Sequence, residues 1–249
     1  MILAIDIGNT ATKVALVLGA RVASRVIVSA DAKAGAVDHA LLRLLRRVRN
    51  LDGVAISSVR PDATESVVRA VVRRTGRYPI VVNHRTPMPI DIAVRRPERV
   101  GTDRLCAACG ALRGRRRDAI VITVGTAITV NLVRNRVFRG GVIMPGVGMS
   151  LAAMHHFTAQ LPKLDLDRLA PKRIDDTESA MHWGALLSGA GGIQLAVELL
   201  EKGSRRRLPR LATGGDVPRV VRWLPANTLL QEDLTLLGLA SIVRHNLAA

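Results

Sequence analysis

Aromatic side chains are scarce in this sequence of 249 residues, which has two tryptophans, two phenylalanines and one tyrosine. Proteins that stack single-stranded nucleic acid bases depend on such rings. No helix-turn-helix or zinc-finger pattern is evident either. The formal net charge of +17 would attract polyanions, but its arginines lie in short, scattered runs. We therefore do not expect nucleic acid to be the main ligand.

Cysteine is almost absent as well. Cys106 and Cys109 stand in an alanine-rich stretch that reads as a helix. This spacing suits either a redox or metal pair or two small core side chains, and zinc would need further ligands. We see no apolar run long enough to span a bilayer. Met1 leads straight into a strand-like segment without the basic start of a signal peptide, so we expect a cytoplasmic protein outside the membrane.

Strand and helix signals alternate along the chain. Apolar runs predict strands at 2–7, 13–18, 21–29, 53–59, 78–83, 119–125 and 209–215. Apolar residues at helical spacing predict helices at 36–50, 62–76, 103–112, 184–200 and 235–247. This alternation indicates an α/β fold.

An internal repeat divides the sequence. The stretch around Gly8, IDIGNTATKV, aligns with ITVGTAITVN around Gly125, and apolar strands flank both turns. We predict a duplicated fold, with an N-terminal domain at 1–117 and a C-terminal domain at 118–249. The cleft between two such halves is a natural ligand site.

The first turn, DIGNT, has a use in phosphate binding. Gly8 would let the backbone approach a phosphate closely, and the following amides and hydroxyls would donate hydrogen bonds to it. Asp6 could hold a hydrated Mg²⁺, and Lys13 could add positive charge. The plainer alternative is an ordinary hairpin with a solvated aspartate. No G-x-x-x-x-G-K-[ST] loop occurs.

A second carboxylate opens the helix predicted at 103–112. Asp103 is either a helix cap or the base that accepts a proton from an acceptor hydroxyl. Arg104, which follows it, would pair with an anionic group of the same substrate. Together the two residues suit a small acceptor that carries both a hydroxyl and a carboxylate.

These motifs occur in a familiar order. The chain resembles the type III pantothenate kinases through DIGNT, VGTDR, VGTAIT, GGVIMPGVGMSLAAM, TAQLP, DTESAMHWG and TGGD. The resemblance implies the actin-like (ribonuclease H-like) ATPase fold of the acetate and sugar kinases, with an interdomain nucleotide cleft. It also implies a homodimer and ATP- and Mg²⁺-dependent phosphorylation of pantothenate, the first step toward coenzyme A.

The resemblance also implies roles for individual residues. The residues expected to hold the ATP phosphates are Asp6, Ile7, Gly8, Asn9, Thr10, Ala11, Thr12, Lys13 and Thr126. Pantothenate would be bound by Gly101, Thr102, Asp103 and Arg104, with Asp103 as the catalytic base. Thr177 matches the threonine that helps bind pantothenate across the dimer.

Two positions depart from the family pattern. Thr123 stands where the family usually has an aspartate that binds K⁺ or NH₄⁺, and a hydroxyl is a poorer cation ligand. Val94 replaces a tyrosine expected in the pantothenate pocket. These changes bear on cation dependence and substrate affinity. They also motivate an alternative, a catalytically impaired homologue that binds nucleotide or a protein partner.

Overall fold

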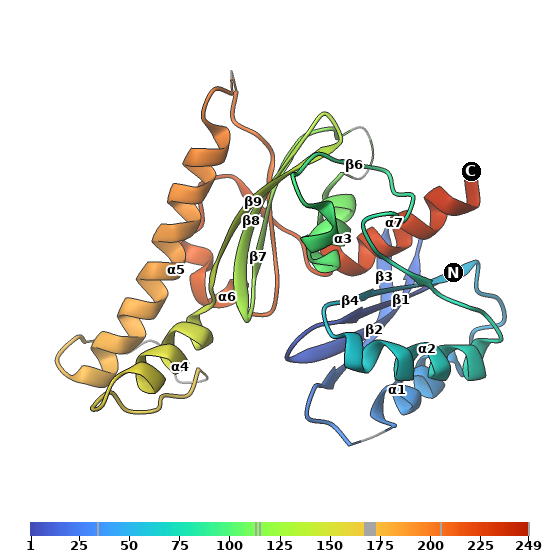
Figure 1. The fold of residues 1–249 in the computed structure, drawn as a ribbon, viewed down its shortest axis with the longest axis horizontal. Coiled ribbons are helices and arrows are strands. Elements are labelled where there is room, and N and C mark those ends of the chain that lie inside the picture. Colours follow the sequence, from blue (N-terminus) through green and yellow to red (C-terminus); the bar gives the residue numbers. More distant parts are fainter. Residues whose placement is uncertain (34, 113, 115, 167–172, 205, 249) are drawn as a thin grey trace. The chain divides into compact units, whose positions relative to one another are not determined.

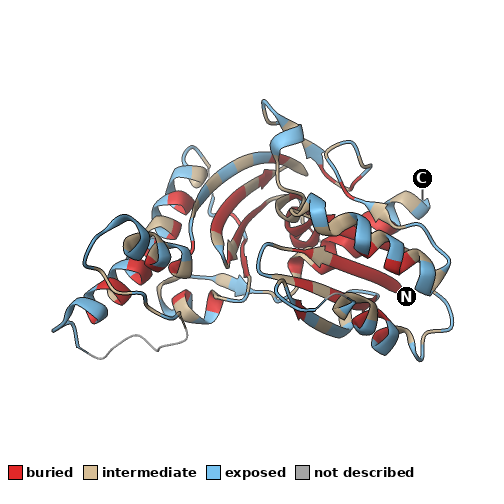
Figure 2. Cartoon of the chain, turned by 60° about the horizontal axis from the view of Figure 1, so that its bottom comes forward, coloured by how far each residue is buried: buried red, intermediate tan, exposed pale blue. Residues whose placement is uncertain are grey.

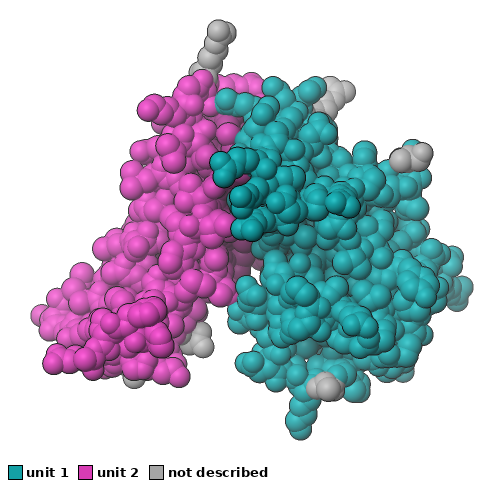
Figure 3. All heavy atoms as spheres, in the orientation of Figure 1, with its two compact units in different colours: residues 1–117, 133–139, 233–249 teal, residues 118–132, 140–232 magenta. Residues whose placement is uncertain are grey.

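The computed structural model describes residues 1–33, 35–112, 114, 116–166, 173–204 and 206–248. The chain forms two compact units, shown in teal and magenta in Figure 3. Unit 1 comprises residues 1–117, 133–139 and 233–249, and unit 2 comprises residues 118–132 and 140–232. The predicted domain boundary after residue 117 stays a prediction, and the packing adds that the last helix belongs with unit 1.

Unit 1 is built on a five-stranded sheet in the order β3-β2-β1-β4-β5. Its strands are β1 (Ile2–Ile7), β2 (Ala11–Leu18), β3 (Arg21–Ser29), β4 (Gly53–Ser58) and β5 (Ile80–Val81). Its helices are α1 (Ala36–Leu45), α2 (Pro61–Thr75), α3 (Thr102–Ala111) and α7 (Leu234–Ala248), with a short 3₁₀ turn, η1, at Pro97–Arg99. The sheet is mixed, because β1 pairs antiparallel with β2 but parallel with β4. Strands β1 to β4 are labelled in Figure 1.

The alternation of side chains along β1 decides which face each residue joins. Leu3, Ile5 and Ile7 belong to the core cluster that α1 and α2 complete. Because successive strand residues point to opposite faces, Asp6 lies on the other face, with Ala4. This is the face on which α7 packs. Both faces of the central strands β1 and β4 are therefore covered, and almost all of their residues are buried (Figure 2).

Helices α3 and α7 approach each other very closely. A Cβ added to Gly238 would lie 1.7 Å from the carbonyl oxygen of Cys106, and one on Gly110 would lie 2.1 Å from that of Leu234. Cys106 and Cys109 are buried in this contact region as free thiols. Burial raises the pKa of Cys109 to about 12. Both cysteines are therefore small core side chains that stay protonated.

Unit 2 carries most of a second sheet, in the order β11-β10-β7-β8-β9-β6. The strands are β6 (Asp91–Ile92), β7 (Ala119–Val124), β8 (Ala127–Arg134), β9 (Val137–Pro145), β10 (Arg210–Thr213) and β11 (Thr228–Leu230). The helices are α4 (Val147–Phe157), α5 (Thr177–Glu201) and α6 (Val217–Val220), followed by the 3₁₀ turn η2 (Val221–Trp223). Strand β6 pairs with Val137 and Phe138, which belong to unit 1.

The strand orders confirm the predicted duplication. Reading β9-β8-β7-β10-β11 against β3-β2-β1-β4-β5, five strands of the second sheet have counterparts in the first, and only the edge strand β6 is added. In both sheets the strand before the glycine turn pairs parallel with a later strand, β1 with β4 and β7 with β10. Thr123 occupies the position in β7 that Asp6 occupies in β1.

Helix α5 corrects one prediction. Its 25 residues have an 18-residue window of mean hydropathy 1.3, long and apolar enough to cross a membrane by length and composition. The predicted absence of such a segment is therefore wrong. The helix contains scattered polar residues, so it does not stand out as an unbroken apolar run. Core helices of soluble proteins pass the same test, and α5 buries one side against the core of unit 2.

Candidate active site

The first glycine turn is tight and open to ligands at its tip. The N–H of Gly8 donates to the carbonyl of Ala11 at 3.0 Å, and a Cβ on Gly8 would lie 3.1 Å from that oxygen. Asn9 and Thr10 are exposed at the tip, whereas Thr12 is buried. The turn thus presents backbone and side-chain donors beyond the carboxyl end of β1.

Asp6 lies at the carboxyl end of β1, where burial and neighbouring charges act on its carboxylate. It stands opposite Lys13 on β2 and opposite Ser57 on β4. Burial raises its pKa to about 6, and the negative charge of Asp103 acts in the same direction. Lys13 and a hydrogen bond with Ser57 lower the pKa in part. The two aspartates singled out in the sequence therefore share one site in unit 1.

Asp103 lies in the first turn of α3. The helix has Gly101 at its N-cap and no side-chain cap, so Asp103 is not the capping residue. A Cβ on Gly101 would lie 2.5 Å from the Oδ1 of Asp103, which is why the position suits glycine. Burial raises the pKa of Asp103 above its usual value, while backbone N–H groups and the charge of Arg104 oppose that rise. A carboxylate with a raised pKa is better suited to accept a proton.

Arg104 is supported by one of the few aromatic rings in the chain. Its guanidinium carbon lies 5.6 Å from the centre of the Phe138 ring, within the range of a cation–π contact. Phe138 is fully buried in β9 and belongs to unit 1. The contact holds the arginine head beside Asp103, where it could pair with an anionic ligand group.

The second glycine turn lies in unit 2, and two further glycine segments converge on it. A Cβ on Gly146 would lie 2.0 Å from the carbonyl oxygen of Gly125. One on Gly214, whose φ is +118°, would lie 2.0 Å from that of Val124. Thr126 at the turn is exposed. The sequence displayed these glycines in GGVIMPG and TGGD, but nothing in it indicated that both segments reach this turn.

The remaining predicted residues are spread over both units. Thr123 is partly buried in β7, in register with Thr213 of β10. Val94 is partly buried between β6 and η1. Thr177 is the first, exposed residue of α5, preceded by a capping box between Asp176 and Ser179. The structure thus gathers Asp6–Lys13 and Gly101–Arg104 in unit 1, whereas Thr126 and Thr177 belong to unit 2.

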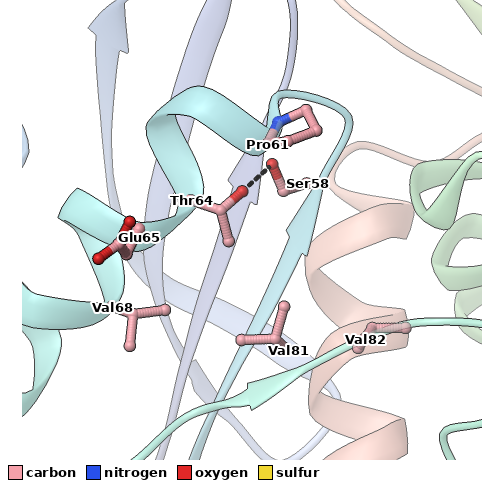
Figure 4. A pocket seen from close by; sticks show the side chains of 7 residues that line it. All are labelled: Ser58, Pro61, Thr64, Glu65, Val68, Val81 and Val82. Atoms are coloured by element: carbon pink, nitrogen blue, oxygen red, sulfur yellow. Dashed lines mark hydrogen bonds between the residues drawn. The ribbon is translucent and has the colours of Figure 1, made fainter.

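A pocket of about 470 Å³ opens beside Ser58 at the start of α2 (Figure 4). Its wall is largely apolar, and the Ser58 and Thr64 hydroxyls within it hydrogen-bond each other at 2.7 Å.

Among the described residues, no three His, Cys, Asp or Glu side chains form a metal-binding group. A cation at Asp6 and Asp103 would therefore be held by one or two carboxylates and by bound phosphate oxygens, as Mg²⁺ commonly is.

Known proteins resemble this chain over most or all of its length. The sequence model of a family described as type III pantothenate kinase matches residues 2–198. A type III pantothenate kinase of Caulobacter vibrioides is 31% identical, over 100% of this chain and 99% of the relative. That of Rhodospirillum rubrum is 34% identical, over 99% of each chain.

Solved structures share the fold at lower identity. A protein of the Baf family of transcriptional activators from Campylobacter jejuni has a TM-score of 0.61 and 18% identity, covering 99% of this chain and 100% of its own. An inorganic polyphosphate/ATP-glucomannokinase from Arthrobacter has a TM-score of 0.50 and 16% identity, covering 100% and 99%. These likenesses show the fold alone, the duplicated actin-like fold of the sugar kinases. The matched family model and the full-length relatives show that this chain belongs to the type III pantothenate kinase family.

Proposed function

We propose that this enzyme phosphorylates pantothenate to 4'-phosphopantothenate with ATP, the first step of coenzyme A biosynthesis. The observation that carries the proposal is the meeting of Asp6 and Asp103 in one partly buried site, next to a glycine turn and to Arg104. The curated relatives bear the name of this activity over the full length of the chain. Both carboxylates that the chemistry needs are present, so no observation favours the non-catalytic alternative.

The residues at the first turn fit ATP with Mg²⁺. Asp6 and Asp103 repel each other, and a divalent cation would relieve that repulsion. Asp6 would hold the cation, and the donors of residues 7–13 would bind the phosphate oxygens. When bound, Mg²⁺ neutralises charge on the transferring phosphoryl group. Thr126 would bind phosphate from the second turn.

Asp103 acts as the general base. As the acceptor oxygen of pantothenate bonds to the γ-phosphorus, the bond from that phosphorus to the ADP oxygen breaks. The hydroxyl proton moves to a carboxylate oxygen of Asp103. The raised pKa of Asp103 makes the carboxylate more basic than an exposed aspartate would be.

Arg104 gives the site its preference for an acid. Its guanidinium would pair with the carboxylate of pantothenate, and Phe138 keeps it oriented. Gly101 leaves the space beside Asp103 that the acceptor hydroxyl needs. Thr177 would reach the same substrate from a second subunit.

A homodimer in the cytoplasm completes the proposal. Leu187, Leu195 and Leu199 lie on one side of α5 and are 51%, 68% and 63% exposed. Such a stripe of leucines on a long helix is suited to pairing with another subunit. It begins three turns from Thr177, so this contact would bring Thr177 near the partner. Thr123 leaves no carboxylate at the position where the family binds K⁺ or NH₄⁺.

A coupled ADP-release assay tests the reaction. Purified protein is given ATP and Mg²⁺, with and without pantothenate, in potassium and in sodium buffers. We expect ADP release that depends on pantothenate and differs little between the two buffers. Folded protein that binds ATP but releases no ADP under any condition would contradict the proposal.

Asp103→Asn tests the base. This variant should bind ATP as the parent does but lose about 10²–10⁴-fold in turnover, the usual contribution of a general base. Nucleotide binding is followed by calorimetry and turnover by the same ADP-release assay. Unchanged turnover would remove Asp103 from that role.

A further inference from the structure

The hydroxyl of Thr102 is fully engaged with β4. Its Oγ1 donates to the carbonyl oxygen of Ser58 at 3.0 Å and accepts the N–H of Ser58 at 3.1 Å. The Oγ of Ser57 lies 3.1 Å away as a third partner. A threonine hydroxyl has one hydrogen and two lone pairs, so the two bonds to Ser58 use the hydrogen and one lone pair, and the Oγ of Ser57 lies beside what remains. Little is left with which this hydroxyl could bind a substrate.

These bonds fasten the start of α3 to the end of β4. The helix has no side-chain cap at Gly101, and the Thr102 hydroxyl ties its first residue to Ser58. The next residue along the chain is Asp103. Any shift of the first turn would therefore move the Asp103 carboxylate with it.

Ser57 connects the Thr102 hydroxyl with the strand position of Asp6, the other carboxylate of the site. It is fully buried and stands in register with Asp6 in the neighbouring strand, where its side chain lowers the pKa of Asp6. One serine thus stands beside Asp6 of β1 and hydrogen-bonds Thr102 of α3. In the sequence this residue is hidden in an ordinary strand pattern, GVAISS.

We propose that Thr102 and Ser57 are positioning residues, which fix the Asp103 carboxylate for proton transfer without contacting pantothenate. This inference rests on the proposed role of Asp103 and replaces the expectation that the Thr102 hydroxyl binds substrate. A misplacement of about 1 Å can cost about 100-fold in rate, so a lost anchor should appear mainly in kcat.

The test compares Thr102→Val with Thr102→Ser, Ser57→Ala and the control Thr75→Val. Thr75 offers a match because its hydroxyl also bonds a backbone carbonyl, that of Val71, at 2.8 Å on α2. We expect Thr102→Val to lower kcat about 100-fold, with the KM for pantothenate within about twofold of the parent. Thr102→Ser should restore most of the rate, and Thr75→Val should leave it unchanged.

A second set of measurements separates positioning from substrate binding and from general damage. In an Asp103→Asn background, Thr102→Val should cause no further loss of the residual rate, because it acts through Asp103. The Kd for pantothenate, measured by calorimetry, should be the same for Asp103→Asn with and without Thr102→Val. If Thr102→Val fails to fold, Ser57→Ala carries the same comparison, with a smaller expected loss of kcat.

Several results would overturn the inference. A Kd or KM for pantothenate raised tenfold or more by Thr102→Val would make its hydroxyl a substrate ligand. An equal loss of rate in the parent and in the Asp103→Asn background would indicate general damage. A rate in Thr102→Val equal to that of the parent would show that Thr102 does not position Asp103, and Asp103 would remain the base. A parent-like rate in Asp103→Asn would refute the base itself and this inference with it.

Discussion

At the scale of single residues, Asp6 works against the stability of its own unit. Its pKa is about 6 in the folded protein against a usual 3.8, so the folded state holds the proton more tightly. The free energy of unfolding therefore falls as pH rises from about 4 to 6 and stays lower above that range. Residues whose environment suits function commonly carry such a cost.

Asp6→Asn should remove this cost. We expect the nucleotide-free variant to gain up to about 3 kcal/mol in the free energy of unfolding at pH 7.5, since each pKa unit corresponds to 1.36 kcal/mol. The gain should shrink to about 0.5 kcal/mol near pH 4 and vanish below about pH 3, where the parent is protonated in both states. Urea unfolding in the presence of a chelator, at pH 7.5, 6 and 4.5, measures it. A difference that does not vary with pH would contradict the assignment.

The second prediction at the scale of single residues concerns Thr123 and the dependence of turnover on potassium. It holds the Asp6 position of the repeat but offers only a neutral hydroxyl. Thr123→Asp should make turnover higher in potassium than in sodium buffer, because a carboxylate would supply a cation ligand. Thr123→Asn, similar in shape but uncharged, is the control. Strong potassium stimulation of the parent would show that the cation site does not depend on this position.

Single residues also show which parts of the site could be predicted from the sequence and which could not. Asp6 and Asp103 stood out because each lies beside a glycine at the end of a strand or the start of a helix. Ser57 did not, since its partners come from β1 and α3, far away in the chain. The contacts of Gly146 and Gly214 with the second turn were hidden for the same reason. Local pattern reveals which residues are unusual, and tertiary packing decides what they touch.

At the scale of elements, the contact between α3 and α7 is the most exacting in unit 1. Gly238→Ala would force a methyl group against the carbonyl oxygen of Cys106. Overpacking of this kind typically costs about 1–3 kcal/mol, and we expect the upper part of that range. Chemical unfolding measures the loss, with Ser241→Ala on the same helix as the control. A variant as stable as the parent would show that the helices separate at no cost.

Elements were predictable where an apolar pattern was strong. Strands β1 to β4 and β7, and helices α1, α2, α3 and α7, lie where the sequence predicted them. Helix α5 begins at Thr177 rather than at residue 184, because its first three residues are polar and the Asp176 capping box starts the helix there. Strands β6 and β11 are too short to leave a periodic signal.

At the scale of the whole molecule, the proposed homodimer makes a direct prediction. A Leu187→Glu, Leu195→Glu double variant should be a monomer by light scattering, because charges would replace the apolar stripe of α5. It should also lose pantothenate-dependent turnover, since Thr177 would no longer reach a partner. Leu42→Glu is the matched control, as Leu42 on α1 is also 51% exposed. A dimeric double variant would place the subunit contact elsewhere.

The membership of α7 in unit 1 has a consequence for synthesis on the ribosome. Translation proceeds at about 5–20 residues per second, so the span from Asp118 to Asp233 takes roughly 6–23 seconds. During that interval α3 has emerged without the helix that covers Gly110 and Cys106. The segments of unit 2 are all complete before α7 leaves the exit tunnel. The half of the protein that begins first is therefore the half that can finish folding only last.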